Sequence, residues 1–104
     1  MRIHYTMHCA WIYIMTNKNN TTLYVGVTTN IYMRVKEHKS CDNLKSFTAR
    51  YKLFKLVYYE GFDSIVDAIA REKFLKKKIR KYKMDLINQF NPLWSDLENN
   101  TAQL

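Results

Sequence analysis

This 104-residue sequence has few acidic residues, few cysteines and no long apolar run. Its two cysteines do not form the regular spacing of a disulfide framework. No apolar run approaches the roughly twenty residues that a membrane-spanning helix needs. The sequence also has no internal repeat, no low-complexity tract and no apolar leader at its start. These absences argue against disulfide-rich, repetitive and membrane proteins, and they predict a cytoplasmic protein with reduced thiols.

The shortage of acidic residues favours a polyanionic partner. Nine Asp and Glu stand against 17 Lys and Arg, so the formal net charge is +8. Between Arg71 and Lys83 eight residues are basic, and only Glu72 is acidic. This segment is either a solvated helix surface or a surface that faces phosphates. On the second interpretation, nucleic acid binds the following side chains: Lys73, Lys76, Lys77, Lys78, Arg80 and Lys81.

The first half of the sequence predicts a β-hairpin followed by a helix. Residues 10–15 are all apolar or aromatic, which is typical of a central strand covered on both faces. Residues 17–20 suit a turn, and residues 21–27 resume a strand pattern. If the loop between the strands has an even number of residues, Tyr13 and Tyr24 point to the same face.

Three further segments complete the predicted fold. Thr28 or Thr29 caps a helix that reaches about Lys39 and carries Arg34 and His38, one turn apart, on one stripe. A polar loop at 40–48 is followed by a third strand at 53–59, which ends by Gly61. Asp63 or Ser64 caps a long helix to about Tyr82, and a short helix covers 84–90 until Asn91 and Pro92 end it.

These elements predict one α+β (α/β) domain, because 47% hydrophobic positions in a chain of this length support one core. A small three-stranded sheet containing the hairpin is flanked by helices within residues 10–97. Residues 1–9 form an N-terminal arm, and residues 98–104 form a C-terminal tail.

Glu72 conflicts with the pattern of the long helix. It lies near the middle of an apolar stripe formed by Ile65, Ala68, Ile69, Leu75 and Ile79. A carboxylate on a core-facing stripe is costly unless it is paired, hydrogen-bonded or bound to a metal. Glu72 is therefore a candidate metal ligand, with a buried ion pair as the alternative.

The order of these parts resembles the GIY-YIG nuclease superfamily, especially its small stand-alone bacterial members, which look like the N-terminal nuclease domain of the excision-repair incision subunit. The matching stretches are WIYIM at 11–15, LYVGVT at 23–28, the arginine-containing helix at 30–38, ARE at 70–72, LIN at 86–88 and NPLW at 91–94. In one departure, Trp11 replaces the glycine of the first motif. This replacement bears on how a substrate approaches more than on the resemblance itself.

The resemblance implies an endonuclease that hydrolyses DNA with a single divalent cation, Mg²⁺ or Mn²⁺. Carried over position by position, it implies the two motif tyrosines, an arginine, a histidine where relatives have His or Tyr, a glutamate that binds the metal, and a late asparagine. These positions are Tyr13, Tyr24, Arg34, His38, Glu72 and Asn88.

The chemistry of these residue types suits that reaction. A hard cation prefers carboxylate oxygen, so Glu72 alone can anchor it. Arg34 can neutralise charge on a phosphate, and His38 can relay a proton or hold a phosphate oxygen. In model peptides the pKa of a tyrosine phenol is about 10. If Tyr24 is the base, a nearby cation or metal-bound water must therefore favour its ionised form. Which of Tyr13 and Tyr24 takes the proton stays open.

Two other functions fit the same sequence. One is a non-catalytic nucleic-acid-binding module that keeps the fold and the basic helix. The other is a protein-interaction module whose positive helix binds an acidic partner, and weak affinity for nucleic acid at physiological salt would distinguish it. Asn88 is similarly open, since it could bind a phosphate, brace Glu72 or simply end a helix.

Overall fold

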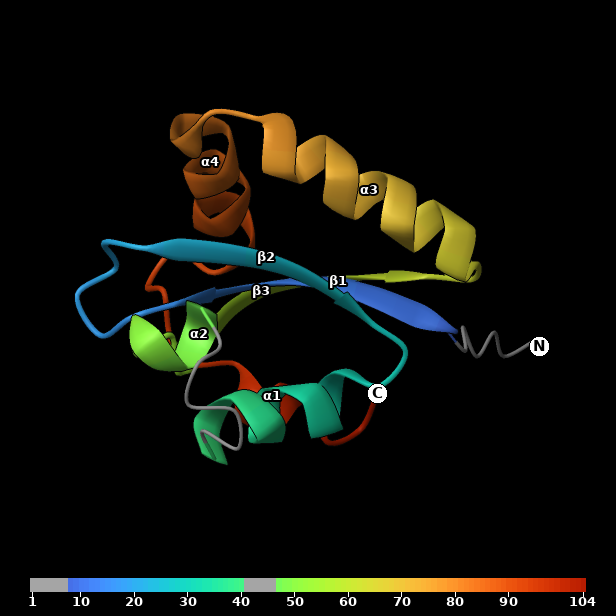
Figure 1. Cartoon of the computed structure of the whole chain (residues 1–104), viewed down its shortest axis with the longest axis horizontal. Coiled ribbons are helices and arrows are strands. Elements are labelled where there is room, and N and C mark those ends of the chain that lie inside the picture. Colours follow the sequence, from blue (N-terminus) through green and yellow to red (C-terminus); the bar gives the residue numbers. More distant parts are fainter. Residues whose placement is uncertain (1–7, 41–46) are drawn as a thin grey trace, which may run out of the picture.

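The computed structural model describes residues 8–40 and 47–104, and a three-stranded antiparallel sheet lies at its centre (Figure 1). The strands are β1 (Ala10–Thr16), β2 (Leu23–Thr28) and β3 (Lys55–Phe62), in the order β2-β1-β3. Every residue of β1 is buried, which confirms the predicted central strand. The parts of the predicted arm and loop at residues 1–7 and 41–46 lie outside the described residues.

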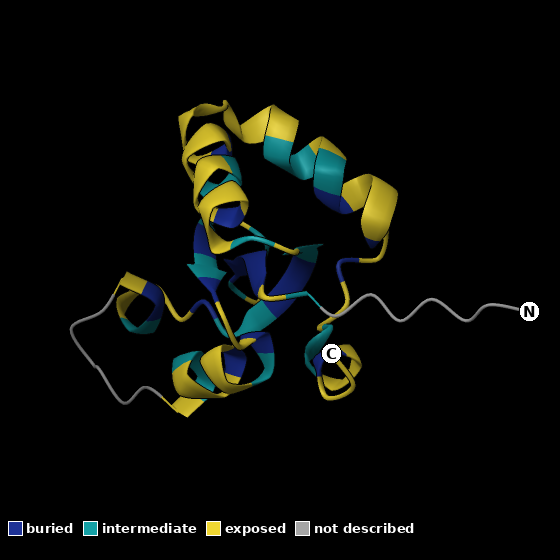
Figure 2. Ribbon diagram, turned by 90° about the vertical axis from the view of Figure 1, so that its right-hand side faces the viewer, coloured by how far each residue is buried: buried dark blue, intermediate teal, exposed yellow. Residues whose placement is uncertain are grey.

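Helices cover both faces of the sheet, which confirms the predicted α+β architecture (Figure 1). The helices α1 (Ile31–Ser40) and α2 (Phe47–Arg50) lie on one face, and α3 (Ile65–Lys77) and α4 (Arg80–Phe90) lie on the other. Figure 2 shows the buried strands between helices whose outer surfaces are exposed. Because successive strand side chains alternate between faces, β1 feeds two cores, with Ile12 and Ile14 in one and Tyr13 and Met15 in the other.

The predicted capping residue is confirmed for one helix and is wrong for the other. Ser64 caps α3, and its hydroxyl accepts a hydrogen bond from the backbone N–H of Asp67. Asn30, rather than Thr28 or Thr29, caps α1, because its side-chain oxygen accepts from the Met33 N–H at 3.1 Å. The Thr28 hydroxyl accepts instead from the Asn30 N–H and so supports the cap.

The prediction of one long helix to Tyr82 is wrong. The helix α3 ends at Lys77, and α4 begins at Arg80. Ile79 was expected on the core-facing stripe, but it is 73% exposed at the break between the helices. Basic residues favour the C-terminal end of a helix, where they interact with its negative dipole end, and the Lys run therefore stabilises an early stop.

The buried stripe of α3 is consequently narrower than predicted. Ala68 and Leu75 are fully buried, whereas Ile65 and Ile69 are each more than a third exposed. The side chain of Glu72 is 14% exposed, so it lies at the border of the core and not at its centre. A carboxylate can occupy this border position without being fully desolvated.

Three shorter segments also differ from the expectation. β3 continues through Gly61 to Phe62 instead of ending before it. The helix α2 starts within the predicted loop, and α5 (Glu98–Thr101) forms within the predicted tail. This last helix packs on α1, where the ammonium of Lys36 lies 3.2 Å from the Glu98 carboxylate. The domain boundary at residue 97 stays a prediction.

Candidate active site

The two motif tyrosines lie side by side on the face of the sheet that α1 covers. β1 pairs with β2 so that Tyr13 is opposite Gly26 and Met15 is opposite Tyr24. The tyrosines are therefore diagonal neighbours on one face, as predicted, with ring centroids 6.3 Å apart. Tyr13 is 2% exposed, whereas Tyr24 is half-buried on the edge strand. Only Tyr24 is thus open to an incoming molecule.

Gly26 makes room for the Tyr13 ring. A Cβ atom added at Gly26 would lie 2.3 Å from Cζ of Tyr13 and 2.4 Å from its hydroxyl oxygen. Carbon atoms do not approach this closely, so any other residue here would displace the phenol. We did not predict this role, although the glycine in the second matching stretch was a visible signal for it.

His38 connects Tyr13 to a residue that sequence reasoning missed. Its Nε2 lies 2.9 Å from the Tyr13 hydroxyl, and its Nδ1 lies 2.8 Å from the hydroxyl of Thr48. Both imidazole nitrogens therefore have hydrogen-bond partners, and the ring is fixed in place. Thr48 is buried at the start of α2. No sequence pattern singled it out, because its partner belongs to a different helix.

Burial keeps this chain of hydrogen bonds electrically neutral. Burial is the largest cause that raises the pKa of Tyr13 far above its ordinary value, and the nearby negative charge of Glu72 adds to the effect. Burial also lowers the pKa of His38, with a further contribution from the positive charge of Arg34. Around neutral pH, Tyr13 is thus a protonated phenol and His38 a neutral imidazole. Of the two tyrosines, Tyr13 is the poorer candidate for a base.

Glu72 reaches the same site from the opposite layer of the fold. Its helix α3 packs against β1 and the edge strand β2, so a side chain on its border can extend past the sheet edge. The Glu72 carboxylate lies 3.3 Å from Nζ of Lys76, and that ammonium lies 5.8 Å from the centre of the Tyr24 ring. Lys76 therefore links the Glu72 carboxylate to the Tyr24 ring, and the negative charge of Glu72 also contributes to the raised pKa of Tyr13.

Arg34 lies one helical turn before His38 on α1. Its side chain is 44% exposed, and its guanidinium is 3.8 Å from the carboxylate of Glu37. Its positive charge lowers the pKa of both Tyr13 and His38, so it acts on the same cluster. Because its ionic contact with Glu37 is long and exposed, this guanidinium can turn toward a phosphate.

Asn88 is not joined to this cluster by any contact within the described residues. It lies on α4, and its side-chain oxygen accepts a 2.6 Å hydrogen bond from the indole N–H of Trp94. This bond fixes the segment after α4 and occupies the oxygen. Its predicted catalytic role stays a prediction, and the structure brings together the other five residues.

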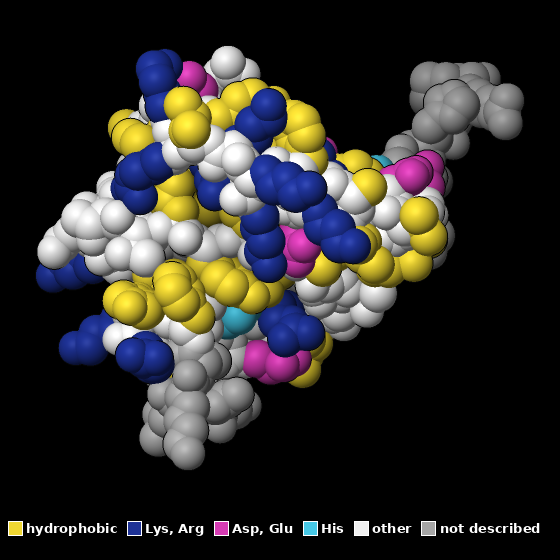
Figure 3. Space-filling model, turned by 45° about the horizontal axis from the view of Figure 1, so that its top comes forward, with side chains coloured by type: hydrophobic (Ala, Val, Ile, Leu, Met, Phe, Trp, Pro, Cys, Tyr) yellow, Lys and Arg dark blue, Asp and Glu magenta, His cyan; other side chains and the backbone are white. Residues whose placement is uncertain are grey.

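The six basic residues predicted to bind nucleic acid are all exposed, but the helix break divides them between α3, α4 and the link between them. Figure 3 shows Lys and Arg side chains crowded around an acidic group on this face. Some have protein partners, since Arg80 donates to the backbone oxygen of Asn20 and Lys81 pairs with Asp85. Burial and the neighbouring charges of Arg80 and Lys76 lower the pKa of Lys83, a sign of concentrated positive charge.

The donor set suits a cation that needs few protein ligands. Within residues 8–40 and 47–104, no three His, Cys, Asp or Glu side chains cluster as a complete metal cage would require. Mg²⁺ usually keeps several waters and takes one or two carboxylates together with substrate phosphates. The partly exposed Glu72 carboxylate fits that requirement, with Lys76 as its present counter-ion.

Comparison with known proteins agrees with the motif order. The GIY-YIG catalytic domain matches residues 9–85. The chain is 38% identical over 82 residues to a UPF0213 protein of Syntrophus aciditrophicus, covering 79% of this chain and 92% of that protein. It is 36% identical over 78 residues to a UPF0213 protein of Clostridium perfringens, covering 75% and 82% of the two chains. No solved structure shows a significant match.

In the part of the chain that the structure describes, no helix is both long and apolar enough to cross a membrane.

Proposed function

This chain belongs to the GIY-YIG catalytic-domain family, and from that membership we propose that it is a metal-dependent endonuclease that hydrolyses DNA phosphodiester bonds. The observation that carries the proposal is the convergence of five side chains from four elements at the edge of β2. They are Tyr13, Tyr24, Arg34, His38 and Glu72.

In the proposed reaction a water oxygen attacks the phosphorus atom, and the bond from phosphorus to the leaving oxygen breaks. Tyr24, after losing its own proton to solvent, takes the proton from the water and becomes a phenol again; it is the more accessible of the two tyrosines and stands on the edge strand. Arg34 donates hydrogen bonds to the phosphate oxygens as negative charge grows on them. The leaving oxygen takes its proton from solvent.

Tyr13, His38 and Thr48 hold the site in shape. The neutral chain of hydrogen bonds through His38 fixes the Tyr13 hydroxyl beside the Tyr24 ring. Tyr13 can then hydrogen-bond the attacking water or the ionised Tyr24, and either contact favours proton removal. Thr48 is a positioning residue in this scheme, since it acts only through His38.

Glu72 would hold the divalent cation. When bound, such an ion supplies Lewis-acid stabilisation of the charge on the phosphate. Lys76 would leave the carboxylate and neutralise a neighbouring phosphate instead, because one carboxylate cannot serve both cations fully. The identity of the ion, Mg²⁺ or Mn²⁺, is part of the proposal.

The test is cleavage of plasmid and of single-stranded DNA by the purified protein with Mg²⁺, with Mn²⁺ and with a chelator. We expect cleavage only with a metal, and a loss of about a hundredfold or more in Glu72→Ala. Cleavage that is equal in Glu72→Ala would identify a contaminant. An absence of cleavage with every metal and substrate would reject the proposal.

The ion pair between Glu72 and Lys76 favours a second candidate, a nucleic-acid-binding module without activity. In that case the carboxylate serves only to hold a lysine in place on a phosphate-binding surface. Salt-sensitive DNA binding without turnover, unchanged by Mg²⁺ or by Glu72→Gln, would support this alternative.

A further inference from the structure

A row of aromatic side chains leads from Tyr24 out to the protein surface. The rings of Tyr24 and Phe47 are stacked, with centroids 6.0 Å apart and an angle of 29° between their planes. Phe47 and Tyr51 lie on successive turns at α2, with ring centroids 4.6 Å apart. Phe47 is 46% exposed and Tyr51 is 48% exposed. Two adjacent rings next to the candidate active site therefore present apolar surface to solvent.

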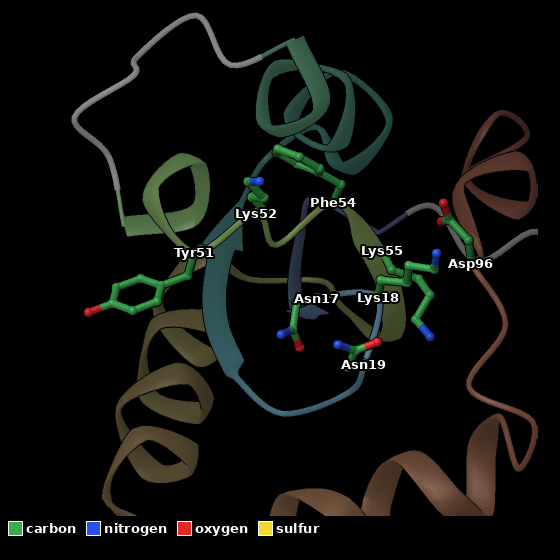
Figure 4. A pocket seen from close by; sticks show the side chains of 8 residues that line it. All are labelled: Asn17, Lys18, Asn19, Tyr51, Lys52, Phe54, Lys55 and Asp96. Atoms are coloured by element: carbon green, nitrogen blue, oxygen red, sulfur yellow. The ribbon is translucent and has the colours of Figure 1, made fainter.

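The row continues into a basic cavity of about 460 Å³ (Figure 4). The cavity lies between the β1–β2 loop and the segment that joins α2 to β3. Its lining residues are Asn17, Lys18, Asn19, Tyr51, Lys52, Phe54, Lys55 and Asp96. Tyr51 both lines the cavity and contacts Phe47, and Figure 4 shows its side chain projecting away from the other lining side chains.

The charge of the cavity is positive. Three lysines line it, whereas its one carboxylate, Asp96, is already paired with Lys39 and accepts a hydrogen bond from the Leu56 N–H. The net charge available to a ligand is therefore that of the lysines. An anionic group of nucleotide size matches both this charge and a volume within the usual range of ligand sites.

Local backbone structure fixes both walls of the cavity. The side-chain oxygen of Asn17 accepts from the backbone N–H groups of Thr21 and Thr22, which holds the β1–β2 loop in one shape. On the other wall Lys52 has a φ of 56°, a left-handed turn that ends α2 and turns the chain into β3. The N–H of Leu53 completes that turn by donating to the Thr48 oxygen at 2.8 Å.

We propose that Phe47, Tyr51 and this cavity form a subsite for unpaired nucleotides adjoining the phosphate that is cleaved. The inference rests on the proposed function, since it places the scissile phosphate beside Tyr24. Unpaired bases stack on exposed aromatic rings, whereas the bases of a duplex are already stacked on one another. Lys18, Lys52 and Lys55 supply the charge that tracks the phosphates of the same strand.

The subsite makes the protein selective for nucleic acid that is unpaired on one side of the cleaved bond. Phe47 and Tyr51 would contribute most of this selectivity, and the lysines would contribute affinity that depends on salt. An acidic protein segment with aromatic residues would also match the charge. Such a segment would compete with a single-stranded oligonucleotide only if it bound the same two rings.

The experiment measures binding separately from cleavage, with Glu72→Gln as the background and a chelator present. The probes are a single-stranded oligonucleotide carrying one 2-aminopurine and a blunt duplex of the same sequence. We expect quenching of 2-aminopurine fluorescence on binding, and about tenfold or greater loss of single-strand affinity in Phe47→Leu and in Tyr51→Ala. Duplex affinity should change far less in both variants.

Phe90→Leu is the matched control, since Phe90 is a comparably exposed aromatic residue on α4, in the layer on the opposite face of the sheet. It should leave single-strand affinity unchanged. Lys18→Gln should lower the slope of log affinity against log salt by about 0.7 for the single strand. Thermal unfolding of each variant shows whether it is folded.

Equal loss for single strand and duplex, no loss in either aromatic variant, or no quenching would overturn the subsite. Because these measurements need no turnover, they separate the two proposals. Stacking without any cleavage in the parent protein would retain the subsite and reject the endonuclease. Cleavage that is unchanged in Phe47→Leu would retain the endonuclease and reject the subsite.

Discussion

On the face of the sheet that α3 and α4 cover, β1 contributes Ile12 and Ile14 to an apolar core with Ala68, Leu75 and Ile87. On the face that α1 covers, the same strand contributes Tyr13, which is equally buried but ends in a hydroxyl bound to His38. One alternating strand thus divides its side chains between an apolar layer and a layer whose apolar core also holds the polar groups of the candidate site. The second layer contains buried polar groups, and each of these must be hydrogen-bonded for the layer to be stable.

At the tyrosines the two layers meet along β2, the edge strand that carries Tyr24. There Glu72 extends from α3 toward the tyrosines of the other layer, and Lys76 follows it. A site at a sheet edge can draw residues from both faces, whereas a site at the sheet centre cannot. The comparison predicts that substitutions on the two faces will separate stability from activity.

Leu75→Ala should give the largest loss of stability. Leu75 is fully buried in the apolar layer, so its truncation removes apolar contacts and leaves a cavity. We expect the free energy of unfolding to fall by about 2–5 kcal/mol, measured by urea unfolding. The remaining folded protein should keep its activity, and the exposed Leu93→Ala is the control. Loss of activity in folded Leu75→Ala would contradict the division between the two faces.

Gly26→Ala should act on the polar layer with a smaller loss of stability. The added methyl group collides with the Tyr13 ring, and overpacking of this kind costs about 1–3 kcal/mol. Activity should fall as well, because the phenol moves. In a Tyr13→Ala background the cost of Gly26→Ala should largely disappear, since the collision partner is gone. An undiminished cost there would show that the glycine is needed for another reason.

Thr48→Val tests the hydrogen-bond chain while keeping the shape of the side chain. It leaves Nδ1 of His38 without its partner, and we expect a loss of about 1–2 kcal/mol in unfolding free energy. Activity should fall in Thr48→Val and recover in Thr48→Ser, which restores the hydroxyl. Nitrogen NMR shifts of His38 should change only in the valine variant. Identical behaviour of both variants would remove Thr48 from the site.

His38 should give the smallest effect, a dependence of stability on pH. Because the pKa of His38 is lower in the folded than in the unfolded chain, the unfolded state binds more protons just below the ordinary value of 6.5. Stability should therefore fall as the pH decreases below about 6.5, until the folded pKa is passed. Urea unfolding at several pH values should show a weaker decrease in His38→Gln. An equal decrease in both proteins would contradict the neutral imidazole.

The sequence predicted the sheet well because its signals are local. Residues 10–15 are all apolar or aromatic, and the polar run at 17–20 indicates a hairpin whose register sets Tyr13 and Tyr24 on one face. Ser64 was found as a cap for a similar reason, since its hydrogen bond lies within one helical turn. The resemblance added Arg34, His38 and Glu72 at positions that the structure then brought together.

The parts that the sequence did not predict depend on contacts between distant segments. Thr48 looked like a loop residue until α2 placed it against His38 on another helix. Ile79 continued the apolar stripe of α3, yet no Gly or Pro marked the break that exposes it. The Lys run before Ile79 was a signal for a helix end, but we interpreted it only as a solvated helix surface or a surface that faces phosphates.

The measurement that tests the account most directly is the electron density of a crystal soaked in Mn²⁺. The account predicts a cation on the Glu72 carboxylate, on the side that faces Tyr24, with Lys76 displaced from its ion pair. Density for Mn²⁺ elsewhere, with the Glu72–Lys76 pair intact at saturating metal, would contradict it.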